Sequence, residues 1–343
     1  MKNGVPSLSD VADKAGVSKS TVSRILNSRL GNGFSVKEEV RQRVIDTAKE
    51  LNYRPNLIAK SLTMQSTRMI HIFGGNHALS DLGNIYQTVV NNITQVMDSV
   101  SKEYDVTVDM SRHATDSSEM PAWKIDGAII LAKCTERTMS EIVRMRIPYV
   151  VINGPCPENG FSVNPDDAGG TRAAIAHLYE LGHRRIAYSG PLPPYLVGHS
   201  SLRDRHDTYL HEMQKYNLEP IFSSHDTLDS SVDFLKETIY EKGVTAILAY
   251  GHMGALNLLQ AAHALRIAVP ERLSLMCFCD KYAHRVMSPV LTFIDLCSEK
   301  MGKVAAELLL DQLQNPDHVN PNSITLQENL VICNSTAPPH SQA

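Results

Sequence analysis

The segment Ser7–Leu26, SLSDVADKAGVSKSTVSRIL, limits the possible folds of this chain more than any other segment. Ser7 and Asp10 have the spacing of a capping box, in which a hydroxyl and a carboxylate satisfy early N–H groups of a helix. Gly16 can take the left-handed conformation that ends a helix at low cost. Between them lies one apolar face, formed by Val11, Ala12 and Ala15. The pattern therefore predicts a short helix followed by a tight turn.

A second helix is expected after Ser18, whose hydroxyl can cap it. Its inward positions are apolar and its outward positions are polar or basic: Val22, Ile25 and Leu26 against Lys19, Ser20, Ser23 and Arg24. Ser35 and Glu38 again have capping-box spacing and predict a third helix. Its apolar positions are Val40, Val44, Ile45, Ala48 and Leu51. Because two helices this short bury little apolar surface, the three should form a bundle.

A bundle of this kind is typical of a helix-turn-helix, which places its second helix in the major groove of double-stranded DNA. Lys19, Ser20 and Arg24 have donors suited to base edges, whereas Thr21 and Ser23 suit phosphate oxygens. The alternative interpretation is a three-helix bundle with an ordinary solvated face, since capped helix pairs are common.

Two segments, Leu8–Asn27 and Leu51–Asn56, resemble the N-terminal module of the lactose/galactose repressor (LacI/GalR) family of transcriptional regulators. The likeness extends over nearly the whole chain, although the loop Asn27–Val36 is longer than the family usually has. It implies a regulator, most often a repressor, that binds a DNA operator. The residues expected to contact DNA are Ser7, Ser18, Lys19, Ser20, Thr21, Ser23, Arg24, Asn27, Tyr53, Asn56, Ala59 and Leu62.

The piece Pro55–Leu62 follows the predicted bundle and by composition is compatible with a plain linker. In the family that it resembles, this piece is a hinge helix that pairs with the hinge of a second copy. By that match Leu62 enters the minor groove and kinks the DNA, with Ala59 as its small neighbour. A helix this short is marginal alone. We therefore expect it to fold only when DNA and the partner hinge supply contacts.

The charge distribution is uneven and agrees with a local contact to a polyanion. Residues 1–60 carry 11 Lys and Arg against 6 Asp and Glu, while the rest of the chain carries 22 against 31. No apolar run is long enough to cross a membrane and no signal-peptide core is present, so we expect a cytoplasmic protein. The 6 cysteines include no C-x-x-C pair, so no disulfide framework, metal site or cofactor is predicted.

From residue 69 onward, apolar strand patterns alternate with helical patterns, which predicts an α/β fold with parallel sheets covered on both faces. Strands are expected at 69–73, 106–110, 127–132, 149–153, 186–189, 245–250, 273–278 and 292–294, and helices at 85–104, 138–145, 166–181, 203–216, 232–242, 255–265 and 299–313. This pattern resembles the two-lobed, periplasmic-binding-protein-like core of the same family. The predicted domains are 1–54 (helix-turn-helix headpiece), 55–67 (hinge and linker) and 68–343 (effector-binding and dimerisation core).

Parallel sheets bind ligands beyond the carboxyl ends of their strands, and two facing lobes would make a cleft there. The residues expected to line it are Phe73, Asn76, Asn153, Arg203, Arg205, Gly251, His252, Cys279, Asp280 and Phe293. The resemblance implies a sugar or sugar derivative as effector. However, Gly251-His252 and Phe278-Cys279-Asp280 replace an Asn-Asp pair and an aromatic-Asp-Asp element of sugar-responsive members. The basic and His-containing tract His199–His206 leaves an anionic metabolite as the alternative.

One recognition helix reads few base pairs, so a homodimer on a near-palindromic operator is expected. The C-terminal segment has no leucine heptad that would join dimers into tetramers. Two other classes of protein are disfavoured. A sugar-binding protein of a transport system would need export, and an enzyme would need a catalytic constellation. The sequence contains no G-x-S-x-G, H-E-x-x-H or P-loop motif, so catalysis is not predicted.

Overall fold

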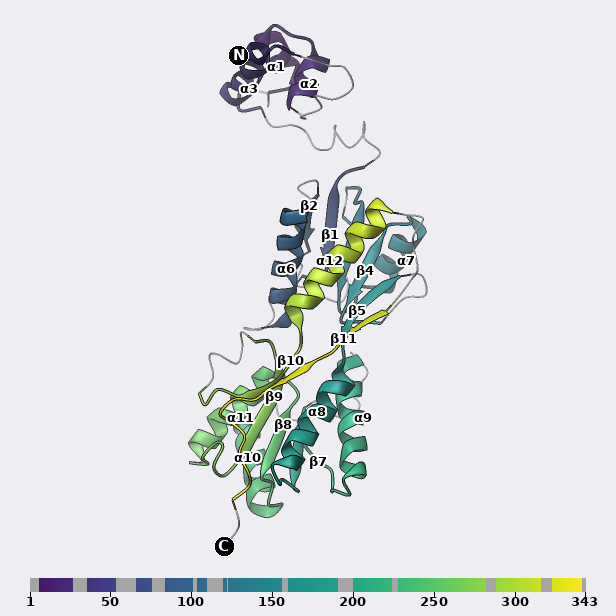
Figure 1. Ribbon diagram of the computed structural model, residues 1–343. Coiled ribbons are helices and arrows are strands. Elements are labelled where there is room, and N and C mark those ends of the chain that lie inside the picture. Colours follow the sequence, from purple (N-terminus) through teal and green to yellow (C-terminus); the bar gives the residue numbers. More distant parts are fainter. Residues whose placement is uncertain are drawn as a thin grey trace. The chain divides into compact units, whose positions relative to one another are not determined.

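The computed structural model describes residues 6–26, 36–53, 66–75, 84–100, 104–109, 120–121, 123–155, 160–190, 200–223, 228–281, 288–315 and 323–340. It divides into two compact units, Met1–Thr67 and Arg68–Ala343, each of which is described separately below (Figure 1). The loop 27–35 and the predicted hinge, including Asn27, Asn56, Ala59 and Leu62, lie outside the described residues.

The first unit is the predicted three-helix bundle, made of α1 (Leu8–Ala15), α2 (Lys19–Leu26) and α3 (Glu38–Glu50). The capping box at Ser7 and the left-handed Gly16 that ends α1, with φ 67°, are both confirmed. The core between the helices consists of Val11, Ala12, Ala15, Val22, Ile25, Val44 and Ala48. Each fully buried Val or Ile in such a core stabilises the fold by about 1.5–3 kcal/mol.

The predicted capping box of the third helix is wrong. α3 begins at Glu38, and its N-cap is Lys37, which supplies no side-chain hydrogen bond. Glu38 is therefore the first helical residue and not the third, so its carboxylate cannot close a box with Ser35, which lies outside the described residues. Glu38 and Glu39 instead place negative charge in the first turn, which favours the positive end of the helix.

The second unit contains two α/β lobes. Lobe 1 is a six-stranded sheet in the order β11-β5-β4-β3-β1-β2, parallel throughout. Its strands are β1 (Met69–Phe73), β2 (Asp105–Val108), β3 (Gly127–Leu131), β4 (Tyr149–Ile152), β5 (Phe161–Pro165) and β11 (Ser323–Leu326), and its helices are α6 (Ile85–Val100), α7 (Glu136–Arg144) and α12 (Ser298–Gln314).

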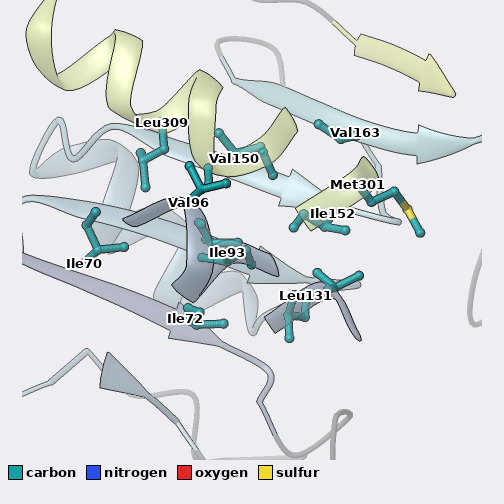
Figure 2. Packing of buried hydrophobic residues seen from close by; sticks show 14 of the residues in the cluster. Ile70, Ile72, Ile93, Val96, Leu131, Val150, Ile152, Val163, Met301 and Leu309 are labelled. Atoms are coloured by element: carbon teal, nitrogen blue, oxygen red, sulfur yellow. The ribbon is translucent and has the colours of Figure 1, made fainter. Parts of the chain in front are cut away.

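Helices α6 and α12 cover one face of this sheet and share a core with it. Figure 2 shows Ile70 and Ile72 of β1 and Val150 and Ile152 of β4 against side chains of the two helices, including Ile93, Val96, Met301 and Leu309. On the other face Ile142 of α7 packs with Phe73, Ala128 and Ile130. The C-terminal part of the chain therefore completes the lobe that the N-terminal part begins.

Lobe 2 has the strand order β12-β10-β9-β8-β6-β7 and is parallel except at the edge pair of β10 and β12. Its strands are β6 (Ile186–Ser189), β7 (Ile221–Ser223), β8 (Ala246–Ala249), β9 (Ser274–Cys279), β10 (Thr292–Asp295) and β12 (Asn329–Val331). The helices are α8 (Asp167–Glu180), α9 (Ser200–Lys215), α10 (Leu228–Leu235), the π-helix η2 (Lys236–Glu241) and α11 (His252–Ala264). Helices α8 and α9 cover one face, and α10 and α11 the other.

The two-lobed α/β core with parallel sheets is therefore confirmed. Four strands were not predicted, namely β5, β7, β11 and β12. Three of these, β7, β11 and β12, lie at or next to sheet edges, have three or four residues and lack a continuous apolar run. The chain passes between the lobes three times: from β5 to α8, from β10 to α12 and from β11 to β12.

Candidate functional site

The outward face of α2 carries the residues predicted to read base edges. Lys19, Ser20 and Arg24 are exposed, whereas Val22 and Ile25 on the opposite face are 0% and 4% exposed. Thr21 and Ser23 are half-buried. The bundle core thus fixes the orientation of the helix, so that its short polar and basic face is presented to solvent.

Serine hydroxyls cap the N-termini of the first two helices. The Thr21 N–H donates to Ser18 Oγ at 3.1 Å, which confirms Ser18 as the cap of α2. The Ser18 hydroxyl also lies 2.8 Å from those of Ser20 and Thr21. Ser7 Oγ accepts from the Asp10 N–H, and both the Ser7 N–H and hydroxyl donate to Asp10 Oδ2. Tyr53, the remaining predicted DNA contact, is half-buried against the bundle, and its burial raises the pKa of the phenol.

In the second unit a cavity of about 620 Å³ is lined by residues of both lobes. Lobe 1 contributes residues near the carboxyl ends of β3 and β4 and the start of α6, and lobe 2 contributes residues of α9, α11 and the ends of β8 and β9. The lining is Asn84, Ile85, Tyr86, Ala132, Lys133, Asn153, Gly154, Pro155, Ser200, Ser201, Leu202, Arg203, Arg205, Tyr250, Gly251, His252, Phe278 and Leu296. The volume is in the range of small-molecule sites.

Five of the predicted cleft residues line this cavity, namely Asn153, Arg203, Arg205, Gly251 and His252. Phe73, Cys279 and Phe293 do not, and the prediction is corrected for them. Their side chains are at most 1% exposed and pack in the cores of the lobes, because alternate residues of a strand point to opposite faces of the sheet. Asn76 lies outside the described residues.

Asp280 also lies elsewhere than predicted. It is 1% exposed and accepts a hydrogen bond from the Ser298 hydroxyl. It lines a second cavity of about 290 Å³, whose other residues are Glu299 and polar residues at and along α6. The Asp280 carboxylate therefore binds Ser298 beside the second cavity and does not line the large one.

Several lining residues were not predicted, among them Lys133, Tyr86, Ser201 and Phe278. Lys133 is the second residue after β3, so the strand-end rule already used for Asn153 would have found it. Tyr86 and Ser201 lie at helix starts, which that rule does not cover. Phe278 occupies the penultimate position of β9, one residue before Cys279, which was predicted to line the cleft.

Arg205 is the most deeply buried charge of the cavity, at 4% exposure. Its Nε donates to Asp167 Oδ1 at 2.6 Å and its Nη1 to the Tyr250 carbonyl oxygen at 2.7 Å. The guanidinium carbon lies 3.9 Å from the ring centre of Phe278 and 4.7 Å from that of Tyr250. A buried pair with additional hydrogen bonds and ring contacts is held rigidly, so Arg205 presents its remaining donors in a fixed direction.

The Glu328 carboxyl belongs to the connection between β11 and β12 and is 4% exposed. Neither of its oxygens has a hydrogen-bond partner among the described residues. Burial, with the charges of Asp167, Asp166 and Asp295, raises the pKa of this carboxyl to about 8, against the opposing effect of Arg205. Glu328 therefore carries a proton at neutral pH, in one of the three crossings between the lobes.

A short hydrogen-bonded chain joins the lobes at the cavity. The Ser201 hydroxyl of lobe 2 donates to Asn153 Oδ1 of lobe 1 at 3.4 Å, and Asn153 Nδ2 donates to the Tyr86 hydroxyl at 3.1 Å. Burial raises the pKa of Tyr86 well above its usual value, so the phenol stays protonated. Asn153 has a left-handed backbone, with φ 55°, at the end of β4.

Within the described ranges, no cluster of three or more His, Cys, Asp or Glu residues is arranged to hold a metal ion. In the same part of the chain, no helix has the length and apolar character needed to span a membrane.

Comparison with known proteins identifies both units. Residues 7–56 match the family of bacterial regulatory proteins of the lacI type, and residues 175–336 match a periplasmic binding protein-like domain. The transcriptional repressor MelR of Bacillus subtilis (strain 168) is 25% identical over 341 residues, which cover 96% of this chain and 98% of MelR.

Two solved structures share the fold. The lac repressor dimer bound to operator and the anti-inducer ONPF superposes with a TM-score of 0.80 at 23% identity, covering 97% of this chain and 100% of that one. The transcriptional regulator CelR in complex with cellobiose gives a TM-score of 0.62 at 23% identity, covering 96% and 99% of the two chains.

The residues 7–56 thus form the DNA-binding module of these regulators, and the core is their effector-binding domain. The chain is a DNA-binding transcriptional regulator that combines a DNA-binding domain of the lacI family with a periplasmic-binding-protein-like core.

Proposed function

We propose that this regulator acts as a homodimeric repressor that binds a near-palindromic operator through α2. The observation that carries the proposal is the exposed set Lys19, Ser20 and Arg24 on a helix whose opposite face is buried and whose N-terminus is capped. Lys19, Ser20 and Arg24 would bind base edges, and Thr21 and Ser23 would bind phosphates. The predicted contacts of Ser7, Ser18, Asn27, Tyr53 and Asn56 belong to the same proposal.

The cavity between the lobes is the proposed effector site. The cellobiose bound to the related CelR supports an effector with a sugar skeleton. Because three crossings join the lobes, a ligand that contacts both lobes can change their closure. The change would reach the DNA through residues 55–67, where Ala59 and Leu62 are proposed to act as a hinge that kinks the operator.

In this proposal a small molecule controls DNA binding and is itself not chemically changed. No catalysis is therefore assigned to the chain. Its relatives are transcriptional regulators. We place it in the cytoplasm because a DNA-binding regulator must reach the chromosome.

The test is a selection of bound sequences from a random DNA pool by the purified full chain. We expect a palindrome with a flexible pyrimidine–purine step at its centre, because such steps kink most easily. Recovery of only sequence-independent binding would contradict the assignment of α2 as a reading helix. Sedimentation of the complex on the selected site should give two chains for each operator, and a single chain for each site would remove the dimer.

A further inference from the structure

The described lining of the large cavity is rich in hydrogen-bond donors. Arg205 uses two of its five N–H groups, towards Asp167 and the Tyr250 carbonyl, and no other hydrogen bond of its guanidinium is present within the described residues. Lys133 and Arg203 add two further cationic side chains. The side chain of Arg203 is 64% exposed, and its Nε lies 3.7 Å from Asp204 Oδ1.

The start of α11 adds backbone donors. Gly251 is the N-cap of this 13-residue helix and has no side chain with which to cap it, and no side-chain cap hydrogen bond is present there within the described part of the chain. Gly251 and His252 both line the cavity, so the first N–H groups of α11 lie at its wall. The helix dipole adds partial positive charge at the same place.

The side-chain acceptors of the described lining are, by contrast, all neutral: the amide oxygens of two asparagines, hydroxyl groups and the His252 ring. None of the described lining residues is Asp or Glu. Asn84 Oδ1 accepts from the Tyr86 N–H at 2.9 Å, Asn153 Oδ1 accepts from Ser201, and the Tyr86 hydroxyl accepts from Asn153. Two nearby carboxylates are bound elsewhere, Asp167 to Arg205 and Asp280 to Ser298, and a third, Glu328, does not line the cavity.

The composition of this site decides between ligand classes. A neutral sugar presents hydroxyl groups that must donate as well as accept, and burying a donor without an acceptor costs about 1–3 kcal/mol each. A carboxylate or phosphate presents acceptors only, and it binds guanidinium groups and helix N-termini strongly. The apolar walls Tyr86, Tyr250, Phe278 and Leu296 can accommodate the rest of a small ligand.

We propose that the effector carries a carboxylate or phosphate group that binds to Arg205, Arg203 and the N-terminus of α11, with Lys133 contributing from lobe 1. This inference rests on the proposed function of the cavity and specifies its ligand. Since Lys133 and the two arginines come from different lobes, an anion between them would favour closure. A neutral sugar would lack that contact.

The experiment is isothermal titration of the full chain with matched ligands: glucose and galactose, their 6-phosphates, their uronates, and inorganic phosphate. We expect at least one acid to bind about tenfold or more tightly than its neutral parent, which corresponds to about 1.4 kcal/mol. Inorganic phosphate should compete with that acid. The uronates and the phosphates distinguish a carboxylate site from a phosphate site.

Two variants connect the affinity to the named residues. Arg203→Gln and Lys133→Gln, both at exposed positions, should each weaken the bound acid several-fold more than they weaken its neutral parent. Arg137→Gln is the matched control, because this residue of α7 is 78% exposed, pairs with Glu141 and does not line the cavity. Equal loss in the control variant would mean a general charge effect and would overturn the assignment.

Two other results overturn the proposal. A neutral parent that binds as tightly as its acids, or a complete lack of binding by the acids at millimolar concentration, contradicts an anionic effector. Tight binding of a neutral parent would still be consistent with the cavity as the proposed effector site. If instead a ligand binds in the cavity and the affinity for the selected operator stays the same, the proposed function of the cavity itself fails.

Discussion

At the scale of single residues, Glu328 is a buried carboxyl whose oxygens have no hydrogen-bond partner among the described residues. Its carboxyl packs over the first turn of α8, where a Cβ on Gly170 would overlap Glu328 Oε2. The charged groups that act on it are Arg205, Asp167, Asp166 and Asp295. Since the folded protein holds a proton on Glu328 up to a pKa of about 8, and an exposed glutamate releases it near about 4.3, folding retains this proton across that interval.

The contribution of Glu328 to the free energy of unfolding should therefore fall as pH rises from about 4.3 to about 8. The fall should be about 1.4 kcal/mol for each pH unit in that interval. Glu328→Gln, which keeps the shape and cannot ionise, should remove part of that slope and be relatively more stable at pH 8 than at pH 5. Thermal unfolding of both proteins at several pH values measures this. Glu219→Gln, at an exposed position, is the control. Parallel curves for wild type and Glu328→Gln would show that the carboxyl is not a buried proton carrier.

On α2, substitutions of Arg24 and Thr21 should have different effects on the sequence specificity of operator binding. Arg24→Ala should cost about 1–3 kcal/mol of operator binding and relax preference at one base position, because a base-edge contact carries sequence information. Thr21→Ala should weaken binding to all sequences alike, although its hydroxyl also contacts Ser18 at 2.8 Å. Binding to every single-base variant of the selected operator measures both. The same loss of specificity in the two variants would contradict the assigned roles.

At the scale of elements, the contact of α6 with α12 depends on one glycine. A Cβ on Gly302 of α12 would overlap the Val89 carbonyl oxygen of α6, whereas one on Gly254 in α11 meets nothing within 4 Å. Gly302→Ala should thus destabilise the core by about 1–3 kcal/mol through overpacking. Gly254→Ala should be neutral or stabilise by up to about 1 kcal/mol, because alanine favours helix. Denaturant unfolding tests the pair, and equal effects would mean that the helices can separate without cost.

The sequence predicted the elements that have a strong local signal and missed those that depend on neighbours. The Ser7 capping box and the apolar runs of β3 and β4 are local, so α1 and these strands were found. Strands such as β11, in which Ser323 and Thr325 are exposed and only Leu326 is fully buried, exist because β5 offers a free edge. The start of α3 was predicted wrongly because Ser35 and Glu38 have the sequence spacing of a capping box, whereas Glu38 is the first residue of the helix and not the third.

The site was predicted in part for a similar reason. Strand ends follow from the pattern of strands, and this rule found Asn153, Gly251 and His252. Which face a side chain takes at the end of a strand depends on the register of the sheet, so Cys279 was chosen where Phe278 lines the cavity. The engagement of Asp280 by Ser298 joins segments 18 residues apart and has no local signal.

At the scale of the whole molecule, the charge is divided between a basic N-terminal part and an acidic remainder. With 11 basic against 6 acidic residues in 1–60, and 22 against 31 beyond, attraction to DNA is limited to the headpiece. Operator affinity should fall steeply with salt, because each phosphate neutralised by a Lys or Arg releases counterions. The acidic core should add no contacts of its own to that slope.

The salt slope can be assigned to a residue. Lys19→Gln should reduce the slope of log affinity against log salt by at most about 1, because it removes one cation from the face that approaches the DNA. Lys14→Gln is the matched control, since its ammonium group already lies 2.6 Å from Glu50 Oε1 at an exposed position of α1. Its slope should change less. Filter or fluorescence titrations between low and physiological salt measure both. If the two variants lose the same slope, the cationic contact is spread over the headpiece and α2 does not approach the DNA more closely than α1.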